Sequence, residues 1–303
     1  MELTPRVREW RDRGVTEDVN GRRIHVFIRA GEGPLLLLLH GFPSSSFDWR
    51  LILDELTDRA VLAFDCLGFG LSEKPREHTY TLAEQADIAE VLLARHAGEL
   101  TGTSSGRAPV FFVAHDMGTS VATELMARDL EGSFGGAAGG YELVGGVLFN
   151  GSMIQGAASP TLGQKLLRGP LGPLAARLSS GRFFRAQFSS IFSPGHPLSD
   201  EEARDQWALI THAGGQRIGH KTIIYMNERE RFADRWYGAI GDWPKPLHLV
   251  WGMLDPVATT NVLDGVRELR PHAPLTPLED LGHYPQIEDP ARLAAAVEAA
   301  VQA

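Results

Sequence analysis

Short apolar runs alternate with helical segments along most of this chain, and the alternation restricts the folds that it can adopt. Runs of four to eight apolar residues are typical of strands buried on both faces of a sheet. The expected strands are RIHVFIRA (23–30), PLLLLLH (34–40), AVLAFD (60–65), PVFFVAH (109–115), ELVGGVLFN (142–150) and PLHLVWG (246–252). Segments between them, such as 81–97 and 117–130, carry apolar residues at helical spacing. The pattern predicts an α/β fold with a mostly parallel central sheet and helices on both faces.

The alternation stops between residues 153 and 243. This stretch is rich in Gly, Pro and Arg, contains helical pieces such as DEEARDQWALI and HKTIIYMNERERFADRW, and has no convincing strand. We expect it to form a helical cap inserted between two strands of the core. The predicted core then consists of residues 1–152 and 244–303, and the predicted cap of residues 153–243.

Composition indicates a small ligand. The net charge of −9 disfavours a nucleic acid as the main partner, and the 303 residues contain no Lys/Arg run that would mark an anionic membrane as a partner. Cys66 is the only cysteine, which excludes an internal disulfide. The start, MELTPRVREWRDRG, lacks the apolar centre of a signal peptide, and LLLLL at 35–39 is too short to cross a bilayer. We expect a cytoplasmic protein, either a monomer or a homodimer.

Two residues are candidates for a catalytic nucleophile. Ser104 lies in a G-x-S-x-G match, but this match falls in a polar loop before a strand, whereas a nucleophile elbow needs a strand before it and a helix after it. Asp116, in AHDMG, has that context, and the small residues Ala114 and Gly118 flank it as a tight turn requires. The sequence therefore favours Asp116. The alternative is that Asp116 only caps the following helix.

HGFP at 40–43 follows an expected strand and is a candidate oxyanion loop. In hydrolases with such an elbow, this loop donates one backbone N–H to an oxyanion, and the residue after the nucleophile donates another. The two donors would be Phe42 and Met117. Gly41 would allow close approach of the main chain, Pro43 would fix the turn, and His40 would lie beside the substrate; HGFP as an ordinary loop is the alternative.

An acid and a histidine follow in the order expected for such a site. Asp255 follows the last expected strand in LVWGMLDPVA, and His283 lies in a loop just before the final helix, in LEDLGHYPQIEDP. The order along the chain is nucleophile, acid, histidine. His283 is preferred over the ten other histidines because its order and its loop context agree.

The motifs HGFPSSSFDW, DCLGFGLSEKP, AHDMG, GMLDPV and GHYPQIEDP resemble those of epoxide hydrolases and dehalogenases of the α/β-hydrolase fold, which use an aspartate nucleophile. YMNERERFADRW is especially similar to the mesoderm-specific transcript group of that superfamily. The resemblance covers nearly the whole chain. It implies that Asp116 forms an alkyl-enzyme ester, that His283, oriented by Asp255, activates water to hydrolyse it, and that no cofactor is needed. A saturated carbon needs a nucleophile already ionised at neutral pH, which a carboxylate is.

The leaving group separates two enzymatic functions. Haloalkane dehalogenases supply side-chain donors such as a Trp after the nucleophile, whereas Met117 and Phe42 cannot donate. An epoxide needs a proton donor, and Tyr225 matches the later of the family's two cap tyrosines. The earlier tyrosine is missing, because no Tyr occurs between 142 and 224. His212 or Tyr237 would assist Tyr225.

We therefore predict a cofactor-independent hydrolase that opens a small apolar epoxide to a vicinal diol. One alternative is a dehalogenase of a small haloalkane or haloacid with the same triad, and another is a binding or signalling protein that has lost turnover. His115 and Trp207 would line the substrate pocket, although packing roles are open for both, as for Tyr225. H-E-x-x-H and paired C-x-x-C metal motifs are missing.

Overall fold

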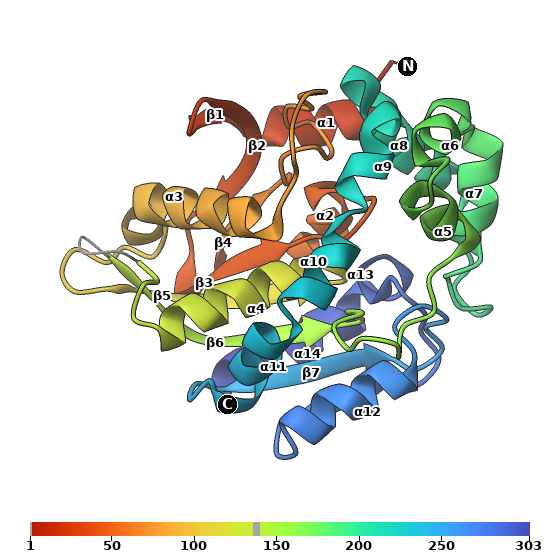
Figure 1. Ribbon diagram of the computed structural model, residues 1–303. Coiled ribbons are helices and arrows are strands. Elements are labelled where there is room, and N and C mark those ends of the chain that lie inside the picture. The colour runs from red at the N-terminus through yellow and green to blue at the C-terminus, as the bar shows by residue number, and fades with distance from the viewer. Residues whose placement is uncertain (1, 136–139) are drawn as a thin grey trace.

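The computed structural model describes residues 2–135 and 140–303 and contains an eight-stranded sheet in the order β1-β2-β4-β3-β5-β6-β7-β8 (Figure 1). β2 is antiparallel to β1 and β4, and the strands from β4 to β8 run parallel. The strands are β1 (Val15–Val19), β2 (Arg22–Arg29), β3 (Glu32–Leu39), β4 (Arg59–Phe64), β5 (Ala108–His115), β6 (Tyr141–Phe149), β7 (Leu247–Gly252) and β8 (Leu275–Leu278). All six predicted strands are confirmed, as is the mostly parallel sheet with helices on both faces.

The alternation of side chains along β3 explains how the sheet holds two helical layers. Leu35, Leu37 and Leu39 point into the core on one face, which α3 (Leu82–Leu100) and α4 (Met117–Leu130) cover. Leu36 and Leu38 point into the other core, which α1 (Pro5–Arg13), α2 (Arg50–Glu55) and α14 (Pro290–Gln302) cover. All five leucines are buried, as expected for a central parallel strand.

The remaining core helices are short or lie at the edges of the sheet. They are η1 (Ser46–Trp49), α12 (Thr260–Leu269) and α13 (Pro285–Glu288). α12 packs on the same face as α3 and α4 through Val262, Leu263 and Val266.

An all-helical segment joins β6 to β7. Its helices are α5 (Leu162–Arg168), α6 (Gly172–Leu178), α7 (Gly181–Ser189), α8 (Asp200–Thr211), η2 (His212–Ile218), α9 (Gly219–Thr222), α10 (Tyr225–Arg231) and α11 (Ala233–Asp242). In Figure 1, α5, α6 and α7 lie together at the margin of the molecule, far from the sheet. α11 instead packs on the core helix α4, where Trp236 Nε1–H donates to Glu124 over 2.9 Å. The predicted cap, residues 153–243, thus includes helices that lie against the core, α11 among them.

Candidate active site

Asp116 lies at the sharp turn between β5 and α4. Its backbone has φ 44° and ψ −109°, in the positive-φ region that non-glycine residues rarely adopt. Gly118 makes this turn possible, because a Cβ at that position would lie 2.2 Å from the carbonyl oxygen of Leu39 at the end of β3. The backbone conformation is typical of a strained functional residue between a strand and a helix.

The two carboxylate oxygens of Asp116 have different surroundings. Oδ2 accepts a hydrogen bond of 2.8 Å from the backbone N–H of Phe42. Oδ1 is buried, and no group among the described residues donates to it. Gly41 permits this approach, since a Cβ there would lie 2.7 Å from the Asp116 Cβ. Met117 begins α4, where the first N–H groups have no partner within the helix.

Asp255 and His283 form a buried pair. The Nδ1–H of His283 donates to Oδ2 of Asp255 over 2.6 Å, which leaves Nε2 of the ring free to accept a proton. Oδ1 of Asp255 accepts from the backbone N–H groups of Val257 (2.7 Å) and Ala258 (3.0 Å). Burial lowers the pKa of His283, but the carboxylates of Asp255 and Asp116 raise it by more, so that it stands above its ordinary value.

Asn150 is hydrogen-bonded to the Asp255 carboxylate of this pair, a role that the sequence did not predict. Its Nδ2–H donates to Oδ2 of Asp255 over 2.7 Å, and its Oδ1 accepts from the N–H of Gly252 over 2.9 Å. It has φ 45° directly after β6. The available signal was a polar residue at the end of the apolar run ELVGGVLFN, on the edge where the other site residues gather.

His40 and His115 lie behind the site, not in the predicted substrate pocket. His40 Nδ1–H donates to the carbonyl of Gly41, and its Nε2 accepts from the N–H of Cys66, each over 2.9 Å. His115 Nε2–H donates to the carbonyl of His283 over 2.8 Å. Burial lowers the pKa of both imidazoles, so they are neutral at pH 7. Both rings hold the loops that carry the site residues.

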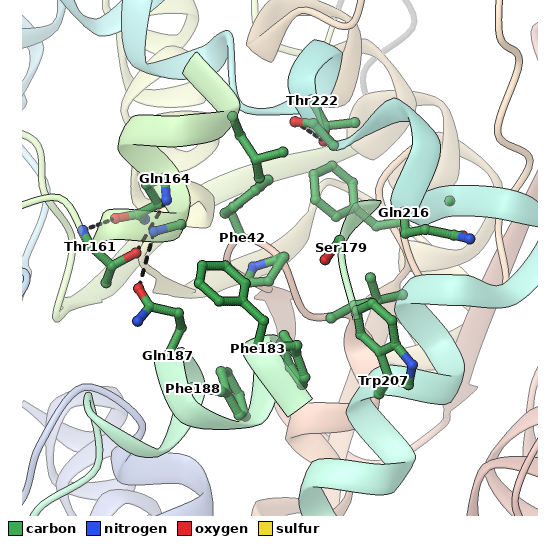
Figure 2. A pocket seen from close by; sticks show the side chains of 18 of the residues that line it. Phe42, Thr161, Gln164, Ser179, Phe183, Gln187, Phe188, Trp207, Gln216 and Thr222 are labelled. Carbon is green, nitrogen blue, oxygen red and sulfur yellow. Dashed lines mark hydrogen bonds between the residues drawn. The ribbon is translucent and has the colours of Figure 1, made fainter. Parts of the chain in front are cut away.

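A cavity of about 130 Å³ lies between core and cap. Figure 2 shows Phe42, Phe188 and Trp207 around it, and Pro43 and His283 also line it. Phe, Leu, Ile and Val side chains dominate this lining, as is common for small-molecule sites. Of the residues predicted at the site, Phe42, Pro43, Trp207 and His283 line this cavity.

Three cap residues that were expected in the pocket do not line it. Tyr237 is engaged elsewhere, since its hydroxyl accepts from the N–H of Gln155 over 2.8 Å. His212 is half-buried at the start of η2. Tyr225 lies behind Phe42, whose ring centroid is 5.7 Å from its own. Burial and the nearby carboxylate of Asp116 raise the pKa of Tyr225, so its hydroxyl keeps its proton.

Arg229, in α10, reaches the nucleophile elbow from the cap. Its Nη2–H donates to the backbone carbonyl of Asp116 over 2.9 Å, and its Nε–H donates to Oγ of Ser120 over 2.7 Å. The guanidinium is buried and lies 4.7 Å from the centre of the Tyr225 ring. Sequence reasoning singled out its motif, YMNERERFADRW, without assigning the arginine.

Ser104, the rejected nucleophile candidate, is exposed in the loop between α3 and β5. This loop precedes β5, so it lies at the amino end of that strand, opposite the edge that carries Asp116. As for metals, the described part of the chain has no group of three or more His, Cys, Asp or Glu side chains placed to hold an ion.

Comparison with known proteins identifies the family. The model of the alpha/beta hydrolase family matches residues 36–296. The chain belongs to the alpha/beta hydrolase family. It is 52% identical over 289 residues to the hydrolase LipZ of Mycobacterium tuberculosis (95% of each chain). It is 36% identical over 298 residues to the human mesoderm-specific transcript homolog protein (95% of this chain, 86% of that one).

Solved structures share the fold of this hydrolase. The epoxide hydrolase CorEH has a TM-score of 0.71 at 20% identity, covering 94% of this chain and 96% of that one. A point mutant of the haloalkane dehalogenase DatA from Agrobacterium tumefaciens has a TM-score of 0.74 at 19% identity, covering 96% of each. Family membership and the names of the relatives make the protein a hydrolase-type enzyme, while these low identities establish the fold alone.

Proposed function

We propose that this hydrolase opens an epoxide to a vicinal diol through a covalent ester on Asp116, without a cofactor. The observation that carries the proposal is the asymmetry of the Asp116 carboxylate. Oδ2 is held by the Phe42 N–H, and Oδ1 has no donor among the described residues. The unpartnered oxygen is the stronger nucleophile, because a hydrogen bond stabilises the charge on the other.

In the first step, Oδ1 of Asp116 attacks a ring carbon, the bond from that carbon to the epoxide oxygen breaks, and the ring oxygen takes a proton. Tyr225 supplies this proton. Its hydroxyl keeps its proton at neutral pH, and its ring lies 5.7 Å from that of Phe42, whose N–H binds Asp116. Because Phe42 lies between Tyr225 and the cavity, the transfer requires the Phe42 ring to move aside when the epoxide binds. The product is a hydroxyalkyl ester of Asp116.

In the second step, a water molecule attacks Cγ of the ester through its oxygen, while Nε2 of His283 takes a proton from that water. Asp255 stabilises the resulting imidazolium through the 2.6 Å hydrogen bond. The charge that develops on Oδ2 meets the N–H of Phe42, which already points at this oxygen, and the N–H of Met117. The bond between Cγ and Oδ1 then breaks, and the imidazolium of His283 gives its proton to the departing oxygen, so the diol leaves with the former Asp116 oxygen. The new carboxylic acid of Asp116 loses its proton to the Tyr225 phenolate, which restores both groups.

The donors available to stabilise a leaving group favour an epoxide substrate over a halogenated one. A departing halide needs fixed N–H donors, and the side chains of Phe42 and Met117 have none. A phenol can stabilise a departing alkoxide, because it can transfer its proton to the ring oxygen as the bond breaks. Two fold relatives carry the two names, epoxide hydrolase and haloalkane dehalogenase, so the fold itself does not choose between them.

A single turnover in H₂¹⁸O with enzyme in excess tests the mechanism. We expect the heavy oxygen in the tryptic peptide that contains Asp116 and an unlabelled diol, because the second oxygen of the diol comes from the carboxylate. Asp116→Ala should lose turnover, and full activity of this variant would refute the proposal. Halide release from haloalkanes with no reaction on epoxides would make the protein a dehalogenase. Tight binding of an epoxide with no product by mass spectrometry would make it a binding protein.

A further inference from the structure

The cap carries an unusual concentration of exposed apolar side chains. Ten large hydrophobic residues among the described ones are exposed, and six of them come from α5, α6, α7 and the turns between them. Single exposed leucines are common on protein surfaces, but contiguous apolar patches usually mark a binding surface. We call this set the cap apolar face; it consists of Leu162, Leu166, Leu171, Leu174, Leu178 and Phe183.

Helix α6 shows that this exposure is organised. Leu171, Leu174 and Leu178 are spaced as i, i+3 and i+7, so they share one side of the helix, and they are 67%, 52% and 70% exposed. The opposite side presents Gly172 and Ala176, which are buried. An amphipathic surface helix normally turns its leucines toward the core. α6 is turned the other way, which leaves an apolar face without a partner in the described part of this chain.

The charge around the cap apolar face differs from that of the whole chain. No acidic residue occurs between Glu142 and Asp200, although the chain carries a net charge of −9. This interval contains five basic residues, Lys165, Arg168, Arg177, Arg182 and Arg185. Lys165, Arg177 and Arg182 are exposed beside the leucines. Arg168 and Arg185 pair with Glu230 and Asp200, outside the interval.

We propose that the cap apolar face docks on the surface of a membrane that contains anionic lipids. Leucines would enter the acyl boundary, while Lys165, Arg177 and Arg182 would contact lipid phosphates. An apolar face whose own segment supplies basic residues and no carboxylate fits this partner, because membrane binding adds buried apolar area to attraction toward anionic lipid. The proposed contact is peripheral. No helix in the described ranges is long and apolar enough to cross a bilayer.

The position of the cavity agrees with this docking. Two of the helices that carry the cap apolar face also line the cavity: α5 through Gln164 and Leu167, and α7 through Phe184 and Gln187. Figure 2 shows Gln164 and Gln187 at this wall. Phe183 belongs to both sets. A docked cap would place a thin helical layer between the lipid and the cavity. The ligands best placed to enter are lipophilic molecules dissolved in the membrane.

Vesicle sedimentation of the full chain tests the proposal without any activity assay. We expect binding to vesicles of phosphatidylcholine with phosphatidylglycerol, weaker binding at high salt, and little binding to phosphatidylcholine alone. The triple variant Leu171→Ser, Leu174→Ser, Leu178→Ser should bind the anionic vesicles at least about tenfold more weakly. Leu130→Ser, which changes an exposed leucine at the end of α4, should bind like the wild type.

A labelling experiment covers the case in which the triple variant misfolds. Cys66, the only cysteine, is buried, so a Leu174→Cys variant can be labelled at one exposed site with an environment-sensitive dye. Anionic vesicles should shift its emission to the blue, and the same dye at Leu130→Cys should not respond. Absence of a shift at position 174 would overturn the proposal. So would a dimer in sedimentation velocity that the triple variant dissociates, because the face would then bind a second copy.

Discussion

The backbone N–H of Phe42 and the carboxylate of Asp116 are joined by a 2.8 Å hydrogen bond. The donor that would stabilise the oxyanion in ester hydrolysis thus already holds the oxygen that would become the oxyanion. Such preorganisation costs no rearrangement at the moment of reaction. It also fixes which carboxylate oxygen is free to attack.

Removal of the imidazole should trap the covalent intermediate. In His283→Gln the ester on Asp116 can form, but no base activates water, so the ester should accumulate and the steady-state rate should fall by at least about a thousandfold. Intact-protein mass spectrometry should show a mass increase equal to one epoxide. His272→Gln, at a surface histidine, is the control. An unmodified His283→Gln protein that still binds epoxide would contradict the two-step mechanism.

The rate should fall at acidic pH with an apparent pKa above 6.5, the ordinary value of histidine. His283 must be neutral to act as a base, and Asp255 helps to raise its pKa, so protons compete for Nε2 already near neutrality. Asp255→Asn removes this stabilisation and should shift the acidic limb of the kcat profile to lower pH, with a lower plateau. Asp264→Asn, at an exposed aspartate of α12, should leave the profile unchanged. An acidic limb that stays in place in Asp255→Asn would show that another group titrates.

Loss of the Tyr225 hydroxyl should slow ester formation more than ester hydrolysis. Tyr225→Phe should lower the single-turnover rate of epoxide opening by about a hundredfold, which is typical of a general acid, while the decay of preformed ester stays the same. Rapid-quench measurement of both phases checks this. Tyr237→Phe is the matched control, because that hydroxyl is already engaged by the N–H of Gln155. Equal opening rates in wild type and Tyr225→Phe would remove the role of Tyr225.

Arg229 should position the nucleophile elbow. Arg229→Met keeps a long side chain but leaves the Asp116 carbonyl and the Ser120 hydroxyl without their buried donor, so unfolding should become easier by about 2–4 kcal/mol. kcat should fall more than KM rises, because the residue acts on the reacting carboxylate through the backbone. Urea unfolding and steady-state kinetics measure both effects. Arg204→Met, at an exposed arginine of α8, should change stability by less than about 0.5 kcal/mol. A stable Arg229→Met protein with normal kinetics would contradict the positioning role.

The sequence was informative where one local pattern determines one local structure. Central strands such as β3 are continuous apolar runs, and all of them were predicted. β1 and β8 were missed, because edge strands are partly exposed and lack such a run. The elbow was recognisable because Ala114 and Gly118 must be small on either side of Asp116.

Contacts between distant segments could not be predicted. Asn150 and Arg229 act on residues 105 and 113 positions away, and nothing near either residue indicates its partner. His40 and His115 looked like pocket residues because they adjoin the oxyanion loop and the nucleophile, but their ring nitrogens bond to the backbone of other segments. The basic residues of the cap are spread over several helices, so no run in the sequence revealed the surface that they share.

Phe42, Asp116, Asn150, Asp255 and His283 follow the ends of five parallel strands, β3, β5, β6, β7 and β8. No single local segment supplies all of these groups. Phe42 meets Asp116 across 74 positions. Catalytic activity therefore requires that all of these strands have paired. A refolding chain can regain its helices early, but it stays inactive until its most distant segments are in contact.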